Sequence, residues 1–188
     1  MTYKNNTFYE KAIKKYGFTP QGVHWKNQQT QYARFDAISS FLDQEKTPFS
    51  LVDAGCGFGE YYHYLSHRKY PVSQYIGIDC EKKMIQYSQK RFPDISFYQK
   101  NILFDPLPFA DFYICSGALN ILQIDEVEIF IRRIYQHSKK GAIFNSLQKE
   151  TFNQIEKEDI VGIIKSFHKH FVIKEDYLDN DFTIALFV

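Results

Sequence analysis

The stretch Leu51-Val-Asp-Ala-Gly-Cys-Gly-Phe-Gly-Glu60 joins an apolar run to three glycines at alternate positions, Gly55, Gly57 and Gly59. The apolar start is typical of a buried strand, and Tyr61-Tyr-His-Tyr-Leu65 is compatible with the first turns of a helix. A strand, a turn that only glycine fits and a helix N-terminus together form a ligand cradle. We therefore expect the rest of the chain to support this loop.

After Pro48 the chain alternates between short apolar segments and amphipathic segments. We expect strands at 49–54, 75–79, 95–98, 111–115 and 142–147, and helices at 58–68, 81–91, 125–137 and 156–169. We expect Gly141 to end the helix that begins at Asp125. Repeated strand–helix units force a mostly parallel sheet with helices on both faces, and ligands bind at the carboxyl ends of its strands. The sequence therefore predicts an α/β fold.

The last two strands are expected at 171–177 and 182–188, on either side of the turn Asp179-Asn-Asp181. Two strands so close together predict a terminal antiparallel hairpin.

Residues 1–48 precede this pattern and are expected to be helical, as a lid or acceptor-binding region on the core of residues 49–188. Helices are expected at 4–16 and 28–44. The single tryptophan, Trp25, lies between them, either as a core residue or as part of a lid.

Size and composition narrow the class of protein. A chain of 188 residues with 44% hydrophobic and 24% charged residues is expected to be one globular domain. A net charge of +1 gives no electrostatic case for nucleic acid or an anionic membrane. Three cysteines, an odd number, and an N-terminus without an apolar core predict a cytoplasmic protein with no membrane span. A monomer and a dimer are both compatible with the sequence.

The glycine loop is compatible with three kinds of ligand. A phosphate-binding P-loop requires a Lys after its glycines, and none follows Gly59. A dinucleotide fingerprint places its third glycine at position 60, where Glu60 would repel a pyrophosphate. S-adenosylmethionine has no phosphates, so a Gly-x-Gly-x-Gly loop can run close beneath it and tolerate Glu60. The spacing therefore favours S-adenosylmethionine.

Asp79 supports this interpretation because it ends the second strand, in Gly77-Ile-Asp79. A carboxylate accepts hydrogen bonds and donates none, which suits the two hydroxyls of a ribose. The alternative is that Asp79 caps the helix that follows it.

Four segments in order, Val52–Glu60, Gly77–Asp79, Asn101-Ile and Asp111–Gly117, resemble the class I S-adenosylmethionine-dependent methyltransferases. The resemblance covers about residues 49–188. It implies a three-layer α/β/α sandwich whose sheet has the strand order 3-2-1-4-5-7-6, with the last strand antiparallel. The chain also resembles small bacterial members that carry Gly-Cys-Gly-Phe-Gly and whose acceptor is unassigned.

The resemblance implies roles for residues of the loop and the second strand. Asp53 would hold the methionine amine, and Gly55, Gly57 and Gly59 would line the methionine and the ribose. Asp79 would bind the ribose hydroxyls.

Further positions would contact the adenine and the sulfonium. Cys56, Cys80 and Met84 would pack against the nucleoside, Asn101 would accept a bond from the adenine amine, and Ile102 would offer its backbone N–H. Asn101 stands where the family usually has Asp. Ser116 and Gly117 would lie beside the sulfonium.

The three cysteines, Cys56, Cys80 and Cys115, each end a predicted strand, so a zinc site with His63 is geometrically conceivable. No Cys-x-x-Cys pair is present, and cysteines also pack well against a nucleoside. We therefore predict no metal.

The predicted function is methyl transfer from S-adenosylmethionine to a small-molecule acceptor by in-line displacement, with S-adenosylhomocysteine as the product. The alternative is a protein that binds the nucleoside without catalysis, as a sensor or scaffold. The sequence identifies no general base, and the candidates are His24, Tyr62 and His63. The Asp/Asn-Pro-Pro-Tyr/Phe signature of many enzymes that methylate base or amide nitrogens is replaced by Ser116-Gly-Ala-Leu119.

Two further polar residues are candidates for ligand contact. Arg34 can pair with the cofactor carboxylate or an acidic acceptor, or it is a solvated helix charge. Asn145, at the end of the fifth strand, either presents its amide to the acceptor or is a satisfied core residue.

Overall fold

The computed structural model describes residue 15, residue 17, residues 27–149 and residues 153–188. The loop that carries His24 and Trp25, and all but one residue of the helix expected at 4–16, lie outside the described residues.

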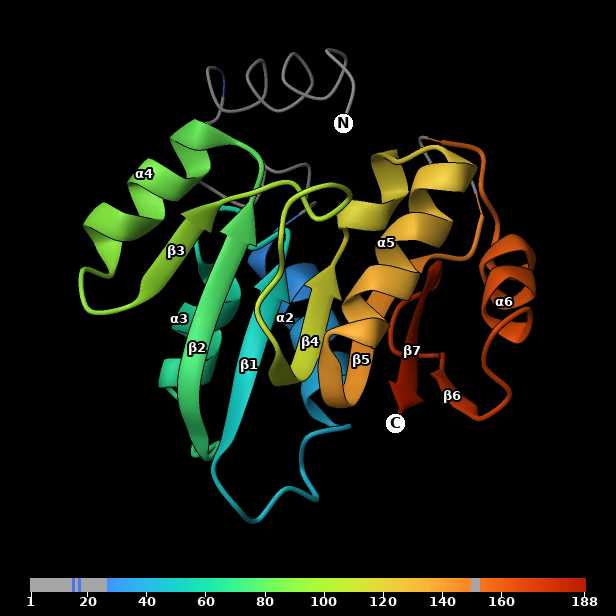
Figure 1. Cartoon of the computed structure of the whole chain (residues 1–188), viewed down its shortest axis with the longest axis horizontal. Helices are drawn as coiled ribbons and strands as arrows, with labels where there is room; N and C mark the ends of the chain where they lie inside the picture. Colours follow the sequence, from blue (N-terminus) through green and yellow to red (C-terminus); the bar gives the residue numbers. More distant parts are fainter. Residues whose placement is uncertain (1–14, 16, 18–26, 150–152) are drawn as a thin grey trace.

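Within the described residues a seven-stranded sheet has the order β3-β2-β1-β4-β5-β7-β6 (Figure 1). The strands are β1 (Phe49–Ala54), β2 (Val72–Asp79), β3 (Ser96–Gln99), β4 (Ala110–Ser116), β5 (Ser138–Leu147), β6 (Phe171–Lys174) and β7 (Asp181–Phe187). Only β7 runs against its neighbours, β5 and β6. The predicted order and the antiparallel last strand are confirmed.

Helices cover both faces of the sheet, because successive strand residues point to opposite sides. The described helices are α2 (Gln28–Ser39), α3 (Glu60–Ser66), α4 (Lys82–Arg91), the 3₁₀ helix η2 (Ala118–Ile121), α5 (Ile124–Gln136) and α6 (Lys157–Lys165). One core packs α5 and α6 on alternate residues of the strands, and the other packs α2 and α3 on the residues between them. The predicted three-layer sandwich is confirmed.

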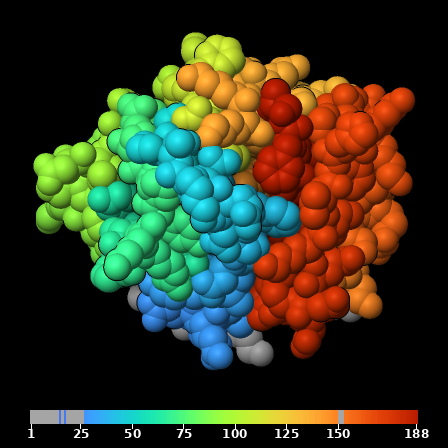
Figure 2. Space-filling model, turned by 90° about the horizontal axis from the view of Figure 1, so that it is seen from below, coloured from blue at the N-terminus to red at the C-terminus, as the bar shows by residue number. Residues whose placement is uncertain are grey.

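The end of the molecule away from the carboxyl ends of the parallel strands is closed by packing. Figure 2 shows the segment that leads from α2 into β1 lying beside the end of β7 on this face. The rings of Phe41 and Phe187 lie 6.4 Å apart, and Lys140 forms an ion pair with Glu45 at 2.5 Å. The open end of the sheet is therefore the end at which the glycine loop lies.

Several predicted boundaries differ from those observed. Gly141 does not end a helix: α5 stops at Gln136 and Gly141 lies inside β5. A side chain there would meet the carbonyl oxygen of Leu186 at 2.7 Å, so the glycine permits close strand pairing. The helices α2 and α6 end earlier than predicted, at Ser39 and Lys165. None of the described helices is long and apolar enough to cross a membrane.

Gly77→Ala tests the packing of β2 beneath the glycine loop. An added methyl group would overlap the Phe97 ring and lie 3.0 Å from the sulfur of Cys56, so something must shift. We expect overpacking to lower the free energy of unfolding by about 1–3 kcal/mol in urea denaturation.

Gly162→Ala is the matched control, because nothing lies within 4 Å of the added methyl group on α6. Its higher helix propensity should stabilise the protein by up to about 1 kcal/mol. Equal effects of the two substitutions would contradict this packing.

Candidate functional site

A cavity of about 410 Å³ opens at the carboxyl ends of β1, β2 and β4. Its walls come from the glycine loop, the start of α4, the segment after β4, α2 and the turn before β7. The lining includes every predicted cofactor-binding residue except Gly59, namely Arg34, Asp53, Gly55, Cys56, Gly57, Asp79, Cys80, Met84, Asn101, Ile102, Ser116 and Gly117.

The glycine loop has the left-handed backbone that glycine favours. The φ angles are +84° at Gly55, +53° at Gly57 and +79° at Gly59. A methyl group on Gly55 would lie 2.7 Å from the Ala118 side chain, so the loop also lies tightly against η2. Gly59 is instead the N-cap of α3 and packs against Phe92, which accounts for its absence from the cavity wall.

The Asp79 carboxylate fixes the loop from the end of β2. It accepts the backbone N–H of Gly57 at 2.9 Å and the backbone N–H of Glu81 at 2.8 Å. Burial raises the pKa of Asp79, and these two backbone donors oppose the rise. Asp79 therefore lies at the cavity, and it is not the cap of α4, because it bonds the N–H of the N-cap residue Glu81 and not one in the first helical turn. A carboxylate has further lone pairs with which to accept ligand hydroxyls.

Asp53 is a second buried carboxylate on the cavity wall, 2% exposed. The hydroxyl of Tyr75 donates to its Oδ2 at 2.5 Å. Burial raises the pKa of Asp53 to about 7, despite this hydrogen bond, and the charge of Asp79 contributes to the rise. A buried carboxylate with one neutral donor is well suited to a cationic ligand group.

The part of the cavity wall between α4 and the segment after β3 carries apolar side chains. Met84 and Ile102 are buried, at 2% and 5% exposure. The side-chain oxygen of Asn101 accepts the backbone N–H of Leu103 at 2.9 Å, which holds its amide against its own loop. Its second lone pair is the one with which it can accept an adenine amine.

The segment after β4 carries the pair Ser116 and Asn145. Their side chains are 3.3–3.4 Å apart, and Asn145 is 1% exposed. Ser116 lines the cavity, whereas Asn145 lies behind it and does not reach the wall. The core interpretation of Asn145 therefore fits, with its amide bonded to Ser116.

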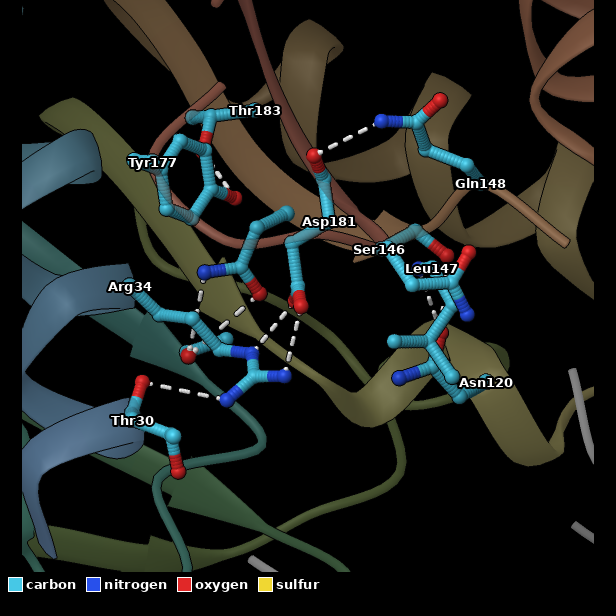
Figure 3. A network of polar contacts seen from close by, with 12 residues as sticks. Thr30, Arg34, Asn120, Ser146, Leu147, Gln148, Tyr177, Asp181 and Thr183 are labelled. Carbon is cyan, nitrogen blue, oxygen red and sulfur yellow. Dashed lines mark hydrogen bonds and ion pairs between the residues drawn. The ribbon is translucent and has the colours of Figure 1, made fainter. Parts of the chain in front are cut away.

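Arg34 closes the cavity from α2 through a contact that the sequence does not reveal. Its Nε and Nη2 donate to the two carboxylate oxygens of Asp181 at 2.5 and 2.7 Å, and Nη1 donates to the Thr30 carbonyl (Figure 3). Both charged side chains are at most 10% exposed. The interpretation of Arg34 as a solvated helix charge is wrong, because Asp181 pairs with it across the fold.

Two of the three candidate bases, Tyr62 and His63, are not brought to the cavity. Tyr62 packs against the rings of Tyr75 and Phe92, and neither Tyr62 nor His63 lines the cavity wall. Burial lowers the pKa of His63. His24 lies outside the described residues.

Comparison with known proteins relates part of the chain to methyltransferases. A family model described as a methyltransferase domain matches residues 51–141. The malonyl-[acyl-carrier protein] O-methyltransferase of Yersinia pestis is 24% identical over 116 residues, which are 61% of this chain. The chain spans only 42% of that curated relative.

Solved structures agree on the fold. Magnesium protoporphyrin IX methyltransferase from Synechocystis PCC 6803, with bound S-adenosylmethionine, has a TM-score of 0.70 at 16% identity, over 98% of this chain and 93% of that one. A TehB-like methyltransferase from Corynebacterium glutamicum has a TM-score of 0.69 at 16% identity, over 99% and 98% of the two chains. Residues 51–141 therefore match the methyltransferase-domain family, and the fold is that of solved S-adenosylmethionine-dependent methyltransferases.

The residues of the cavity fit S-adenosylmethionine. The loop carries no cation for a phosphate, and Glu60 is paired with Arg91 at 2.8 Å. Asp53 and Asp79 together offer acceptors for an ammonium group and for ribose hydroxyls. The described residues contain no group of three His, Cys, Asp or Glu that could hold a metal ion.

Two cavity residues were missed by sequence reasoning, Gln31 on α2 and Asn120 on η2. Gln31 is 3% exposed, and its Oε1 has no hydrogen-bond partner among the described residues. Helical periodicity indicates that Gln31 faces inward with Phe35, but an amide among polar residues gives no local signal.

The raised pKa of Asp53 predicts a pH-dependent difference between the protein and Asp53→Asn. The unfolded chain loses this proton near pH 4, and the folded protein loses it near pH 7. The unfolded state therefore binds fewer protons between these values, so wild-type stability falls as the pH rises through this window. In Asp53→Asn the amide oxygen can still accept from Tyr75, and this loss is absent.

Urea denaturation of both proteins from pH 4.5 to pH 8 measures the effect. Between pH 4.5 and pH 8, we expect the free energy of unfolding of the variant to rise by roughly 2–4 kcal/mol relative to that of the wild type. Parallel pH profiles would show that Asp53 is charged in the folded protein throughout.

Proposed function

We propose that this chain transfers the methyl group of S-adenosylmethionine to a small-molecule acceptor and leaves S-adenosylhomocysteine. One observation carries the proposal: one cavity places the buried carboxylate of Asp53 and the half-buried carboxylate of Asp79 beside a glycine loop without a phosphate-binding cation. This donor-poor, acceptor-rich arrangement matches a ligand with an ammonium group and a ribose diol.

The cofactor, when bound, supplies a methyl group activated on a sulfonium sulfur. In this proposal Asp79 accepts from the ribose hydroxyls, Asp53 holds the ammonium, and Asn101 and Ile102 bind the adenine edge. Ser116 and Gly117 lie beside the reacting centre. The chain thereby fixes one direction of approach for the acceptor.

Positioning is the main task of the protein in an in-line displacement. The acceptor atom must lie about 3 Å from the methyl carbon, opposite the sulfur. The new bond forms as the carbon–sulfur bond breaks, and the electron pair of that bond returns to sulfur. The acceptor proton leaves to water in this proposal, or it is absent from the start when the acceptor is already ionised.

The acceptor remains to be assigned, and the relatives do not share one. The names of the two relatives specify a malonyl-[acyl-carrier protein] and magnesium protoporphyrin IX. Domains with one fold methylate many different acceptors, so the fold alone does not identify the acceptor of this chain. Residues 1–48 are proposed to complete the acceptor pocket, since α2 already forms one cavity wall.

A second candidate function is binding of the same nucleoside without catalysis, as a sensor or scaffold. The observation in its favour is that Tyr62 and His63, two of the three candidate bases, lie away from the cavity. Single-turnover assays with radiolabelled S-adenosylmethionine and a pool of small metabolites separate the two functions. Methyl transfer supports catalysis, and tight cofactor binding without any transfer supports the binding protein.

Asp79→Ala tests the shared claim of cofactor binding. The substitution removes the proposed ribose acceptor and the partner of the Gly57 N–H, so S-adenosylmethionine should bind more weakly by about 1–3 kcal/mol. Isothermal titration calorimetry measures the affinity. Asp94→Ala, in an exposed turn before β3, is the matched control and should bind as the wild type does. Undetectable binding to the wild type would refute both functions.

A further inference from the structure

Asn120 lies on the cavity wall next to the proposed sulfonium position, and the cofactor assignment leaves it without a role. It belongs to η2, which follows Ser116 and Gly117 directly. The residue is 8% exposed, so its amide is buried apart from the cavity.

The orientation of the Asn120 amide is fixed by two donors. The hydroxyl of Ser146 donates to its Oδ1 at 2.8 Å, and the backbone N–H of Leu147 donates to the same oxygen at 3.3 Å (Figure 3). Because a backbone N–H can only donate, the acceptor must be the amide oxygen. The NH₂ group is therefore on the other side of the carboxamide, where its hydrogens can reach the cavity.

Among the described residues, the wall beside this NH₂ group includes apolar side chains from the same segment and from the turn before β7. Ile121, Leu122 and Leu178 line the same cavity. Leu147 is paired in register with Asp181, whose carboxylate holds Arg34 through two hydrogen bonds. The charge of Arg34 is thus compensated within the protein. A carboxylate ligand at this place would be desolvated beside Asp181, and Arg34, the cation nearest to Asp181 among the described residues, is already paired with it.

We propose that the Asn120 NH₂ group anchors the methyl acceptor by donating a hydrogen bond to an uncharged oxygen, a hydroxyl or carbonyl, on a mostly apolar small molecule. The proposal rests on the proposed function, and it names the class of acceptor. The anchored oxygen orients the molecule, and Asn120 takes no proton. The chain would then select against acceptors that present a carboxylate at this position.

Side-chain amide NMR signals of ¹⁵N-labelled protein test this directly. The protein is saturated with S-adenosylhomocysteine and titrated separately with 4-methylphenol, benzoate and toluene, which share a ring and differ in oxygen and charge. We expect saturable shifts of the Asn120 NH₂ signals with 4-methylphenol alone. The NH₂ of Asn153, which donates to the carbonyls of Leu119 and Leu122, is an internal control and should not move.

Asn120→Asp assigns these signals and tests the donor. The substitution keeps an oxygen for Ser146 and Leu147 and removes the N–H donor. We expect 4-methylphenol to bind roughly 5- to 10-fold more weakly, as for one lost hydrogen bond. The affinity for S-adenosylhomocysteine should change less than fivefold, whereas a larger loss would place Asn120 in the cofactor site and overturn the proposal.

The wild-type titration remains decisive if the variant does not fold. Shifts that are larger with benzoate, or no shift of the Asn120 signals with any probe, would overturn the proposal while leaving cofactor binding intact. Failure of S-adenosylhomocysteine to bind the wild type is a different result, which would refute the proposed function itself.

Discussion

The Asp79 carboxylate is the interaction on which the site depends. It joins the end of β2 to the turn after β1 through the Gly57 N–H, and it joins β2 to the start of α4 through the Glu81 N–H. The turn after β1 and the junction between β2 and α4 thus meet at one half-buried carboxylate. The loop conformation, with positive φ at Gly55 and Gly57, is stable in this geometry because its backbone donor has a partner.

The same carboxylate explains why the cavity selects a particular kind of ligand. A carboxylate is buried at a free-energy cost unless hydrogen bonds compensate it, and Asp79 accepts from the backbone of Gly57 and Glu81 and from Cys80. Asp53 accepts a hydrogen bond from Tyr75. Both groups therefore retain capacity for donors from a ligand, whereas a phosphate would be repelled. These two carboxylates are the reason we propose a ligand without phosphates for this loop.

Local patterns predicted the sheet because each strand–helix unit leaves its own signature. The run from Phe49 to Ala54 became β1 with the predicted bounds, and the strand order that the resemblance to methyltransferases implied is the order observed. The cavity residues were also predictable, since Asp53, Asp79 and Ser116 end neighbouring parallel strands. Carboxyl ends of such strands meet at one edge of a sheet.

Local sequence patterns did not predict contacts between side chains that are far apart in the chain. Arg34 and Asp181 are 147 residues apart in the chain, and nothing near Arg34 distinguishes it from an exposed helix charge. The orientation of the Asn120 amide depends on Ser146, which is 26 residues away on β5. Tyr62 and His63 follow the glycine loop directly, yet the rotation of α3 turns them toward Phe92 and away from the cavity. Side-chain direction at the ends of short helices is set by packing rather than by sequence periodicity.

The part of the cavity around Arg34, Asp181 and Asn120, where we propose that the acceptor binds, differs in its polar contacts from the part around Asp53 and Asp79. It combines an ion pair compensated within the protein with an amide whose oxygen is already bonded. A crystal structure of the complex with S-adenosylhomocysteine tests the whole arrangement most directly. The account predicts that the ribose hydroxyls lie within hydrogen-bonding distance of Asp79 and that the sulfur lies beside Ser116, facing Asn120. A nucleoside bound in the reverse direction, or outside this cavity, would contradict it.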